Sequence, residues 1–252
     1  MISDPDLAAV AGLMGDRSRA CFLLELMSGE ELPASELAAR AGVSSPLASA
    51  HLSRLLDGGL VSARRSGRQR LYRISQPEVA EAIEGLVRIA PERRTHSLRA
   101  FDQGRAIQRA RTCYDHLAGA LSVALAQRLE RDGMVRSANS RAYEVTDRGV
   151  SWLAEEMSID VAALAKERRM LARRCIDGTE RRPHLGGALG AAMLERMLAL
   201  RWVAKISGSR ALRTTSRGQQ AFGRLTGHWL LDLGQNSRAW TISSEPYMQN
   251  SS

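Results

Sequence analysis

The chain has 252 residues, of which 44% are hydrophobic, 4% aromatic and 25% charged. This composition excludes a disordered polymer and fits a globular protein of one to three small domains. No apolar stretch approaches the ~20 residues that a membrane-spanning helix needs, and the start, MISDPDLAAV, lacks the basic and apolar segments of a secretion signal. We therefore expect no membrane partner and a cytoplasmic location.

Cysteine and charge narrow the function classes further. Three cysteines, Cys21, Cys113 and Cys175, are an odd number at wide spacing, which favours reduced thiols over a disulfide framework. The 36 basic and 27 acidic side chains leave a formal net charge of +9. Nearly all the cations are arginine, whose planar guanidinium suits phosphate groups and guanine edges. This bias indicates a polyanionic partner, although a GC-rich genome produces the same excess of arginine.

The first forty residues predict three helices. Apolar residues recur at helical spacing over residues 4–14 and 16–28, and each segment follows an aspartate that can cap its N-terminus. A short helix is predicted over residues 35–41, and Gly42 ends it.

The next predicted helix has two different faces. It starts at Ser44 or Ser45, with Pro46 in its first turn, where the missing N–H costs nothing. One face is small and polar, which allows close approach to another molecule: Ser45, Ser49, Ala50, Ser53 and Arg54. The other face is expected to be buried: Leu47, Leu52, Leu55 and Leu56.

A basic hairpin follows this helix. The stretch LVSARRSGRQRLYRIS predicts two short strands around a tight turn at Ser66 and Gly67. A helix with a small polar face fits the major groove of DNA, and a basic hairpin beside it reaches phosphates or the minor groove. Each element alone is also compatible with a solvated helix face or a soluble loop. The ordered combination predicts a DNA-binding surface.

Residues 10–90 resemble the winged helix of the ArsR-type bacterial repressors, with SSPLASAHLSRLLDGGLVSARRSGRQRLYRIS matching recognition helix and wing. The resemblance implies a homodimer joined through residues 4–14 and 77–90, which places two recognition helices in successive major grooves of a palindromic operator. It also implies a set of DNA contacts: Ser44, Ser45, Ser49, His51 and Arg54 from the helix, with Arg64, Arg65, Arg68 and Arg70 from the wing. The alternative for His51 is packing within the domain.

The metal site typical of that family is missing. Metal-sensing members carry two cysteines in a run resembling ELCVCDL, whereas this chain has ELPASEL, with Pro33 and Ser35 at the thiol positions. Neither side chain holds a soft metal, and the segment PEVAEAIEGLVRIA has no histidine pair for zinc. We therefore expect any signal to be sensed outside the DNA-binding domain, residues 1–90.

An internal repeat occupies most of the remaining chain. The phrase HLAGALSVALAQRL from His116 aligns with HLGGALGAAMLERM from His184, and SRAYEVTDRGVSWL from Ser140 aligns with SRALRTTSRGQQAF from Ser209. Each copy follows the winged-helix order of helix, strand, turn, strand and Thr-capped helix, without an evident recognition helix. We therefore predict a mainly α-helical protein with small β-hairpin wings, whose C-terminal module consists of two degenerate winged-helix-like repeats.

The predicted boundaries follow from composition and from the repeat. They are a linker or frayed helix at residues 91–105, a duplicated effector-binding module at 106–233 with repeats at about 106–165 and 168–233, and a polar tail at 234–252.

Equivalent residues of the two copies are expected to face each other at the seam between them, where a duplicated fold forms a pocket. We expect a small organic effector there, with no metal cofactor. The predicted effector-binding residues are Arg111, Cys113, Tyr114, His116, Cys175, Arg181 and His184. Because Cys113 and His116 are three residues apart, we interpret them as lying on one face of a helix.

Three alternatives remain for this seam. Its thiols and imidazoles, from Cys113, His116, Cys175 and His184, suit a tetrahedral zinc or other soft-metal site. Cys113 and Cys175 suit a thiol redox sensor, and Cys113 with His116 suits a thiol enzyme. No G-x-S-x-G elbow, phosphate-binding glycine loop or H-E-x-x-H pair supports catalysis. The predicted function is a ligand-responsive, non-enzymatic transcriptional repressor.

Overall fold

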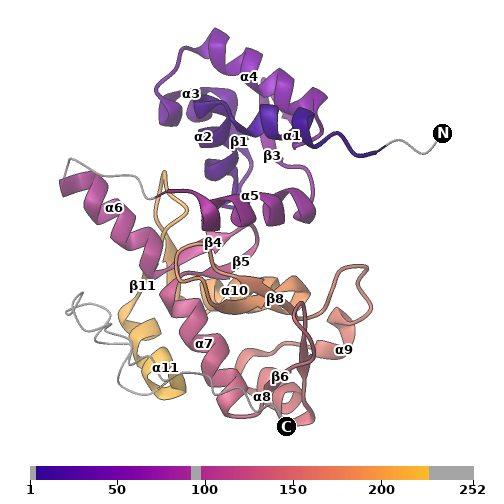
Figure 1. Cartoon of the computed structure of the whole chain (residues 1–252). Helices are drawn as coiled ribbons and strands as arrows, with labels where there is room; N and C mark the ends of the chain where they lie inside the picture. The colour runs from indigo at the N-terminus through magenta and orange to yellow at the C-terminus, as the bar shows by residue number, and fades with distance from the viewer. Residues whose placement is uncertain (1–3, 92–97, 227–252) are drawn as a thin grey trace.

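The computed structural model describes residues 4–91 and 98–226, which form an N-terminal winged helix on top of a C-terminal module (Figure 1). No helix within those ranges is long and apolar enough to cross a membrane. The elements of the N-terminal domain are α1 (Leu7–Met14), α2 (Arg17–Leu26), β1 (Leu32–Pro33), α3 (Ala34–Ala41), α4 (Ser45–Asp57), β2 (Val61–Ser66), β3 (Gln69–Ile74) and α5 (Pro77–Ile89).

Local sequence fixes the helix ends of this domain. Asp6 caps α1 and Asp16 caps α2, because each carboxylate accepts backbone N–H groups of the first turn. Gly42 ends α3 in the left-handed conformation, with φ of 67°. The three helices predicted before this glycine are therefore confirmed, with shifts of a few residues at their ends.

The predicted wing is also confirmed. Strands β2 and β3 pair antiparallel from Val61 opposite Ile74 to Ser66 opposite Gln69, so the turn consists of Gly67 and Arg68. The short strand β1 adds to the free edge of β3. Below this sheet, the side chains of α2, α3 and α4 form one apolar core: Phe22, Leu26, Leu37, Leu52 and Leu55.

The C-terminal module repeats one order of elements after α6 (Leu98–Arg109). Each copy has a hairpin, a long helix, a second hairpin and another helix. The first copy contains β4 (Arg111–Cys113), β5 (His116–Ala118), α7 (Ala120–Arg131), β6 (Val135–Ser137), β7 (Tyr143–Val145) and α8 (Asp147–Met157). After α9 (Val161–Leu164), the second contains β8 (Arg173–Ile176), β9 (Pro183–Gly186), α10 (Gly187–Ala199), β10 (Val203–Lys205), β11 (Leu212–Thr214) and α11 (Ser216–Thr226).

This order departs from the sequence prediction in one place. Each copy opens with a hairpin, where a winged helix has the helices of its helix-turn-helix. Helix α6 occupies part of the segment predicted as a linker or frayed helix at residues 91–105, of which residues 92–97 lie outside the described ranges. The predicted tail at residues 234–252 also lies outside them.

The two copies exchange backbone contacts reciprocally. Thr112 N–H donates to the carbonyl oxygen of Arg210 at 2.9 Å, and its equivalent Arg174 donates to Arg141 at 2.8 Å. Helix α7 of the first copy packs on β9 of the second, and α10 of the second packs on β5 of the first. The two copies therefore share one apolar core, which includes Leu121 and Leu125 from the first and Leu189 and Met193 from the second.

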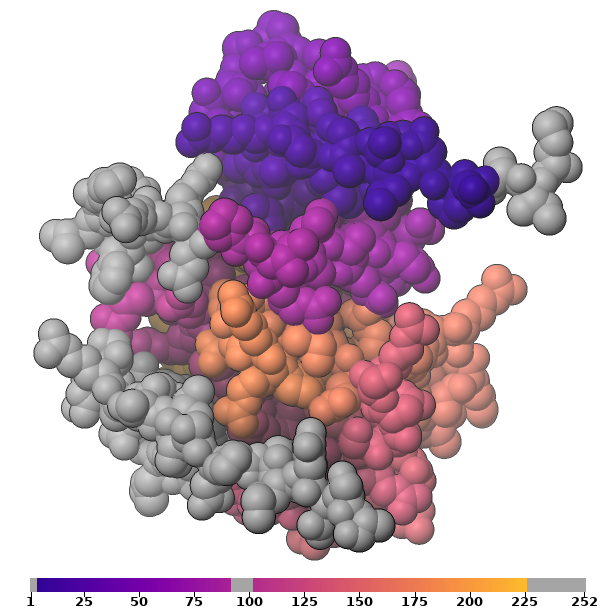
Figure 2. Space-filling view, in the orientation of Figure 1, coloured from indigo at the N-terminus to yellow at the C-terminus, as the bar shows by residue number. Residues whose placement is uncertain are grey.

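The winged helix and the module share packing at their junction. The apolar core of the winged helix includes Cys113 and Cys175, although both belong to the C-terminal module. Helix α5 lies between the two parts, and the space-filling view shows its segment in direct contact with the module below it (Figure 2). The winged helix and the module are therefore joined by close-packed side chains.

Candidate functional site

The outer face of α4 presents the predicted small polar surface. Ser44, at the N-cap, and Ser45, Ser49 and Arg54 are all exposed. The opposite face is buried through Ala48, Leu52 and Leu55, and α4 lies at the end of the molecule away from the C-terminal module (Figure 1). A surface of this kind is open to a long ligand such as duplex DNA.

The prediction that Leu47 belongs to the buried face is wrong. Its relative exposure is 46%, and Leu56 is only half-buried. The buried stripe runs through Ala48, Leu52 and Leu55 at helical spacing, which turns the neighbouring position 47 toward solvent. Leu47 therefore adds an apolar side chain to the outer face of α4.

His51 lies toward the interior of the domain. Its Nδ1 atom is 3.4 Å from a guanidinium nitrogen of Arg19 and 3.6 Å from the Asp16 carboxylate, and its ring meets Phe22 edge to face. These contacts support the alternative of packing within the domain over a DNA contact. The cap of α2 is thereby linked to the recognition helix.

Of the arginines predicted on the wing, Arg64 is paired with an acidic side chain, and the others are not paired with one in the part of the chain that the structure describes. Arg64 forms an ion pair with Glu31 at 2.5 Å. Arg65 and Arg68 are exposed at the tip, and Arg70 is exposed with its guanidinium 5.6 Å from the centre of the Tyr72 ring. Arg65 and Arg68 have no ion pair within the described ranges, so they are available to phosphate groups.

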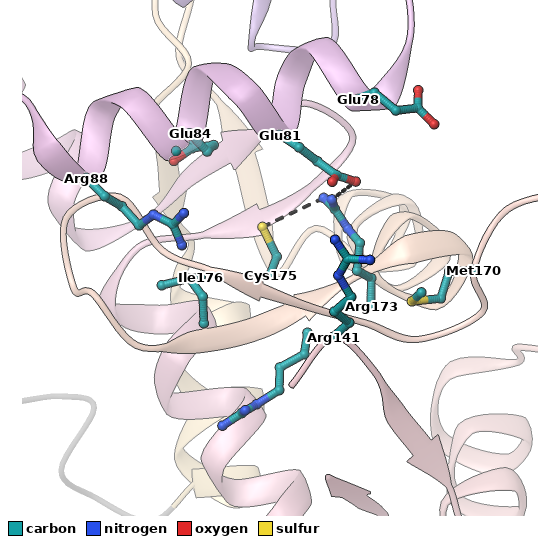
Figure 3. Close-up of a pocket in the computed structure, with 11 residues that line it drawn as sticks. Glu78, Glu81, Glu84, Arg88, Arg141, Met170, Arg173, Cys175 and Ile176 are labelled. Carbon is teal, nitrogen blue, oxygen red and sulfur yellow. Dashed lines mark hydrogen bonds and ion pairs between the residues drawn. The ribbon is translucent and has the colours of Figure 1, made fainter. Parts of the chain in front are cut away.

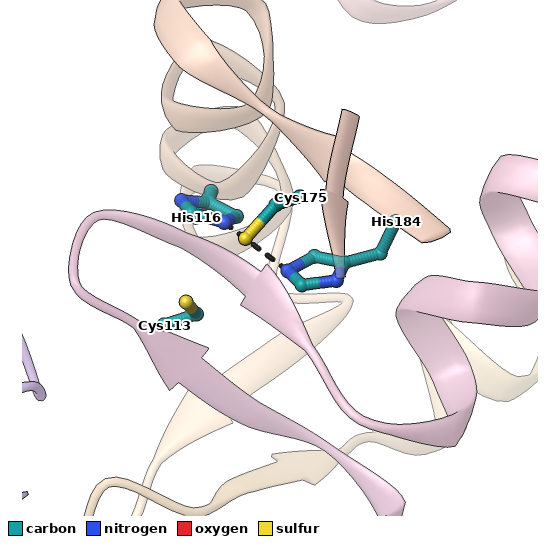
Figure 4. A group of neighbouring side chains, drawn as sticks. All are labelled: Cys113, His116, Cys175 and His184. Carbon is teal, nitrogen blue, oxygen red and sulfur yellow. Dashed lines mark hydrogen bonds between the residues drawn. The ribbon is translucent and has the colours of Figure 1, made fainter. Parts of the chain in front are cut away.

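In the C-terminal module, the two hairpins place the predicted cysteines and histidines together. Cys113 is directly opposite His116 across β4 and β5, and Cys175 is directly opposite His184 across β8 and β9. One ligand atom from each residue lies within 4.8 Å of every other (Figure 4). All four side chains are buried, so the cluster is enclosed by protein.

The prediction that Cys113 and His116 share a helix face is wrong. The residues belong to two strands joined by a tight turn, in which Tyr114 adopts a left-handed backbone with φ of 62°. Cross-strand neighbours approach as closely as residues one helical turn apart, which explains why the pairing itself was still anticipated.

An acidic side chain orients one imidazole of the cluster. His116 Nδ1 donates to the Asp115 carboxylate at 3.1 Å, and Arg169 donates to the same carboxylate at 2.6 Å. This bond leaves His116 Nε2 facing His184 Nε2 at 3.1 Å. His184 Nδ1 is buried and has no hydrogen-bond partner in the described part of the chain.

The electrostatic surroundings of the cluster favour a negatively charged Cys175 and a positively charged His116. Burial lowers the pKa of His116, but hydrogen bonds with Asp115 and Cys175 outweigh it and raise that pKa to about 9. The Cys113 thiol and the two imidazoles hold the pKa of Cys175 well below its usual range, whereas the hydrogen bond to Cys175 and burial raise that of Cys113. The cluster therefore stabilises negative charge on Cys175.

The remaining predicted effector residues lie outside this cluster or support it. Arg111 is fully buried, with Asp177 at 3.0 Å and Glu84 at 3.8 Å. Tyr114 N–H donates to Met27 of the winged helix at 2.9 Å, and Arg181 is exposed in the turn between β8 and β9. The structure therefore does not bring Tyr114 and Arg181 together as walls of one pocket.

Three acidic residues that position these groups were not predicted. Asp115 orients His116, and Asp177 pairs with Arg111 and accepts the N–H of Gly119 at 2.6 Å. Glu84 reaches Arg111 from α5, in the other domain. Because Asp115 directly precedes His116 in the sequence, its contact with that histidine could have been predicted. The contact of Glu84 with Arg111 could not, because it depends on how the two domains pack.

Two cavities adjoin the cluster. The seam between the copies holds about 10 Å³ between Leu117, Leu185 and Met193, which is the size of one water molecule. A cleft of about 350 Å³ lies between α5 and β8, lined by acidic residues of α5 and by Arg141, Arg173 and Cys175 (Figure 3). This seam cavity is smaller than an organic effector, whereas the larger cleft is lined in part by Cys175.

Comparisons with known proteins place this geometry in context. Residues 14–63 match the helix-turn-helix domain family. The chain is 39% identical over 219 residues to the uncharacterized HTH-type transcriptional regulator YdfF of Bacillus subtilis (strain 168), covering 87% of this chain and 96% of that protein. It is 40% identical over 70 residues to a probable mercury resistance operon repressor of Streptomyces lividans, covering 28% of this chain and 55% of that protein.

A solved structure is similar to the N-terminal part. It is the homodimeric winged helix-turn-helix DNA-binding domain Mb0332 of Mycobacterium bovis, described as a possible ArsR-family transcriptional regulator. The match has 31% identity and a TM-score of 0.30, covering 35% of this chain and 88% of that one.

Proposed function

The chain belongs to the family of HTH-type transcriptional regulators, and we propose that it is a repressor that binds a palindromic operator as a homodimer and releases it in response to an effector. The ArsR-type resemblance of residues 10–90 agrees with this membership. The observation that carries the proposal is the outward, unobstructed face of α4 beside a wing with exposed arginines. The family consists of regulators, and we propose no catalytic role for the buried Cys113 and His116.

In the proposed complex, α4 enters the major groove and the wing follows the backbone. Ser45, Ser49 and Arg54 contact base edges, because small side chains at the start of the helix permit close approach. Arg65 and Arg68 contact phosphates and supply affinity without base preference.

Apolar side chains on α1 and α5 support the homodimer. Leu7 and Val10 on α1 have exposures of 78% and 37%, and Leu86 and Ile89 on α5 have exposures of 47% and 79%. Exposed large apolar side chains on two helices of one domain are candidates for a protein interface. A twofold dimer joined there presents two copies of α4 to successive major grooves, about 34 Å apart.

The effector is proposed to act at the cysteine and histidine cluster and the adjoining cleft. The turn of the hairpin β4–β5 contacts the end of α2 through Tyr114 and Met27, and Arg173 pairs with Glu81 of α5. Effector binding that displaces these contacts changes the orientation of the winged helices and their match to the groove spacing. By linkage, operator DNA then weakens effector binding by the same factor.

The test uses the full-length protein and duplex DNA from its own promoter at low salt. Fluorescence anisotropy is expected to show saturable binding that is tighter than binding to a scrambled duplex of the same composition. Equal affinity for both duplexes, or no binding at low salt, contradicts the proposal. Analytical ultracentrifugation of the same complex checks for two protein chains per duplex.

A further inference from the structure

The four-residue cluster is built symmetrically from two equivalent hairpins. Each hairpin contributes one thiol and one imidazole from directly opposed strand positions, Cys113 with His116 and Cys175 with His184. Their ligand atoms lie within 4.8 Å of one another, and the two histidine Nε2 atoms are 3.1 Å apart. Two nitrogens bound to one tetrahedral zinc ion lie about 3.3 Å apart, given zinc–nitrogen bonds of about 2.0–2.1 Å.

The surroundings of the two histidines favour a metal ion between their Nε2 atoms over a direct hydrogen bond between them. His116 Nδ1 donates to Asp115, which directs its Nε2 atom toward His184 Nε2 at the centre of the cluster, where a bound metal ion would replace the Nε2 proton. A carboxylate that orients a histidine in this way is the usual outer neighbour of a metal ligand. The facing Nε2 atom belongs to His184, whose buried Nδ1 has no partner within the described residues. A cation between the two Nε2 atoms satisfies both lone pairs at once.

The donor set selects the class of metal. Two thiolates and two imidazoles are soft to borderline ligands that suit tetrahedral zinc, whereas calcium and magnesium require oxygen ligands. Two thiolates also neutralise a divalent ion, which allows the complex to be buried without net charge. Cys113 and Cys175 have exposures of only 2% and 8%, so the complex would be enclosed.

We propose that Cys113, His116, Cys175 and His184 form a tetrahedral zinc site that fastens the two copies of the C-terminal module to each other and holds the β4–β5 turn against the winged helix. Both cysteines also belong to the apolar core of the winged helix. Between Cys113 and His116, the turn donates from Tyr114 to Met27 of α2. The effect of zinc on DNA binding rests on the function proposed above.

The first experiment measures metal binding by the full-length protein. One zinc ion per chain is expected by elemental analysis, and replacement by Co²⁺ is expected to give the visible absorption of a tetrahedral ion with a sulfur charge-transfer band. Cys175→Ser and His184→Gln are expected to lose stoichiometric binding. The matched controls Cys21→Ser and His51→Gln are expected to keep it, because both residues lie in the winged helix outside the cluster.

A second measurement does not depend on the folding of variants. X-ray absorption at the zinc edge of the wild-type protein is expected to show two sulfur and two nitrogen ligands. An all-nitrogen or oxygen ligand set, binding that survives both ligand substitutions, or protein isolated without metal and with a Cys113–Cys175 disulfide each overturns the inference. The positioning residue Asp115 is tested by Asp115→Asn, which is expected to weaken zinc binding about 10- to 100-fold with an unchanged ligand set.

The third measurement compares the DNA affinity of zinc-loaded and metal-free protein. A change of about tenfold is expected, which is typical of coupling between two sites, and unchanged affinity overturns the connection to the winged helix. The two proposals fail separately. Absence of zinc with intact operator binding refutes only this inference, and stoichiometric zinc without operator binding refutes only the proposed function.

Discussion

The backbone N–H of Tyr114 donates to the carbonyl oxygen of Met27 at 2.9 Å, which joins the first hairpin of the C-terminal module to the end of α2. Gly29 completes this contact, because a Cβ atom at that position would collide with the Tyr114 carbonyl oxygen. The junction between the domains is therefore formed by backbone groups in close contact, which tolerate little displacement.

Gly29→Ala is expected to loosen this junction. Gly29 has φ of 72°, so alanine incurs a left-handed backbone cost of about 1–2 kcal/mol in addition to the collision. Gly42→Ala is the matched control, because Gly42 has φ of 67° and open space around its Cβ position. Thermal unfolding should show a larger loss for Gly29→Ala, and equal losses would show that the Tyr114 contact contributes nothing to stability.

Recognition helix and wing are expected to respond differently to substitution. Arg54→Ala or Ser49→Ala should relax base preference, and loss of one bidentate arginine contact costs about 1–3 kcal/mol at the cognate sequence. Arg68→Ala should weaken binding to all sequences and lower the salt slope by about 1. Anisotropy titrations over a salt series with operator and scrambled duplexes measure both effects. Uniform loss in all three variants would refute this division of roles.

Ile89→Glu on α5 is expected to dissociate the homodimer. The substitution replaces a large apolar side chain, which is 79% exposed in the monomer, by a charged one that would be buried in the proposed interface. Val150→Glu is the control, since Val150 is 40% exposed on α8 in the C-terminal module. Sedimentation velocity should show a monomer for Ile89→Glu and an unchanged dimer for Val150→Glu. Dimers of both variants would mean that α5 does not form the interface.

Arg111→Met is expected to destabilise the fold strongly, because it leaves Asp177 buried without its cation and leaves Glu84 with Arg210 alone, at 3.5 Å. Breaking a buried ion pair in this way costs about 3–5 kcal/mol. Arg136→Met is the control, since its pair with Glu144 has side-chain exposures of 68% and 50%, and exposed pairs contribute about 0–1 kcal/mol. Urea unfolding compares the two, and similar midpoints would assign Arg111 a role other than structural support.

The winged helix was predictable because its signals are local. Capping by Asp16, termination at Gly42 and the pattern of leucines in α4 each depend on residues within a few positions of one another. Leu47 was misplaced because it adjoins the buried Ala48, and adjacent residues of a helix point about 100° apart. The structural role of His51 depends on α2, which the pattern within α4 does not contain.

The C-terminal module was only partly predictable. Its internal repeat matched Cys113 with Cys175 and His116 with His184, and these equivalences brought the right four residues together. The helix predicted through Cys113 and His116 was wrong, because the turn at Tyr114 uses a left-handed tyrosine in place of the glycine or asparagine that marks tight turns. The bond between Thr112 and Arg210 joins positions far apart in the chain, and no local pattern encodes it.

The reciprocal exchange between the copies has an evolutionary consequence. Since Thr112 bonds to Arg210 and Arg174 to Arg141, the first hairpin of each copy has a backbone hydrogen bond that the other copy accepts. A chain with one copy would need a second molecule to complete the module and the cluster of two cysteines and two histidines. Fusion into a single polypeptide replaces that bimolecular encounter by a high effective concentration, and it frees each half to diverge toward its own neighbours.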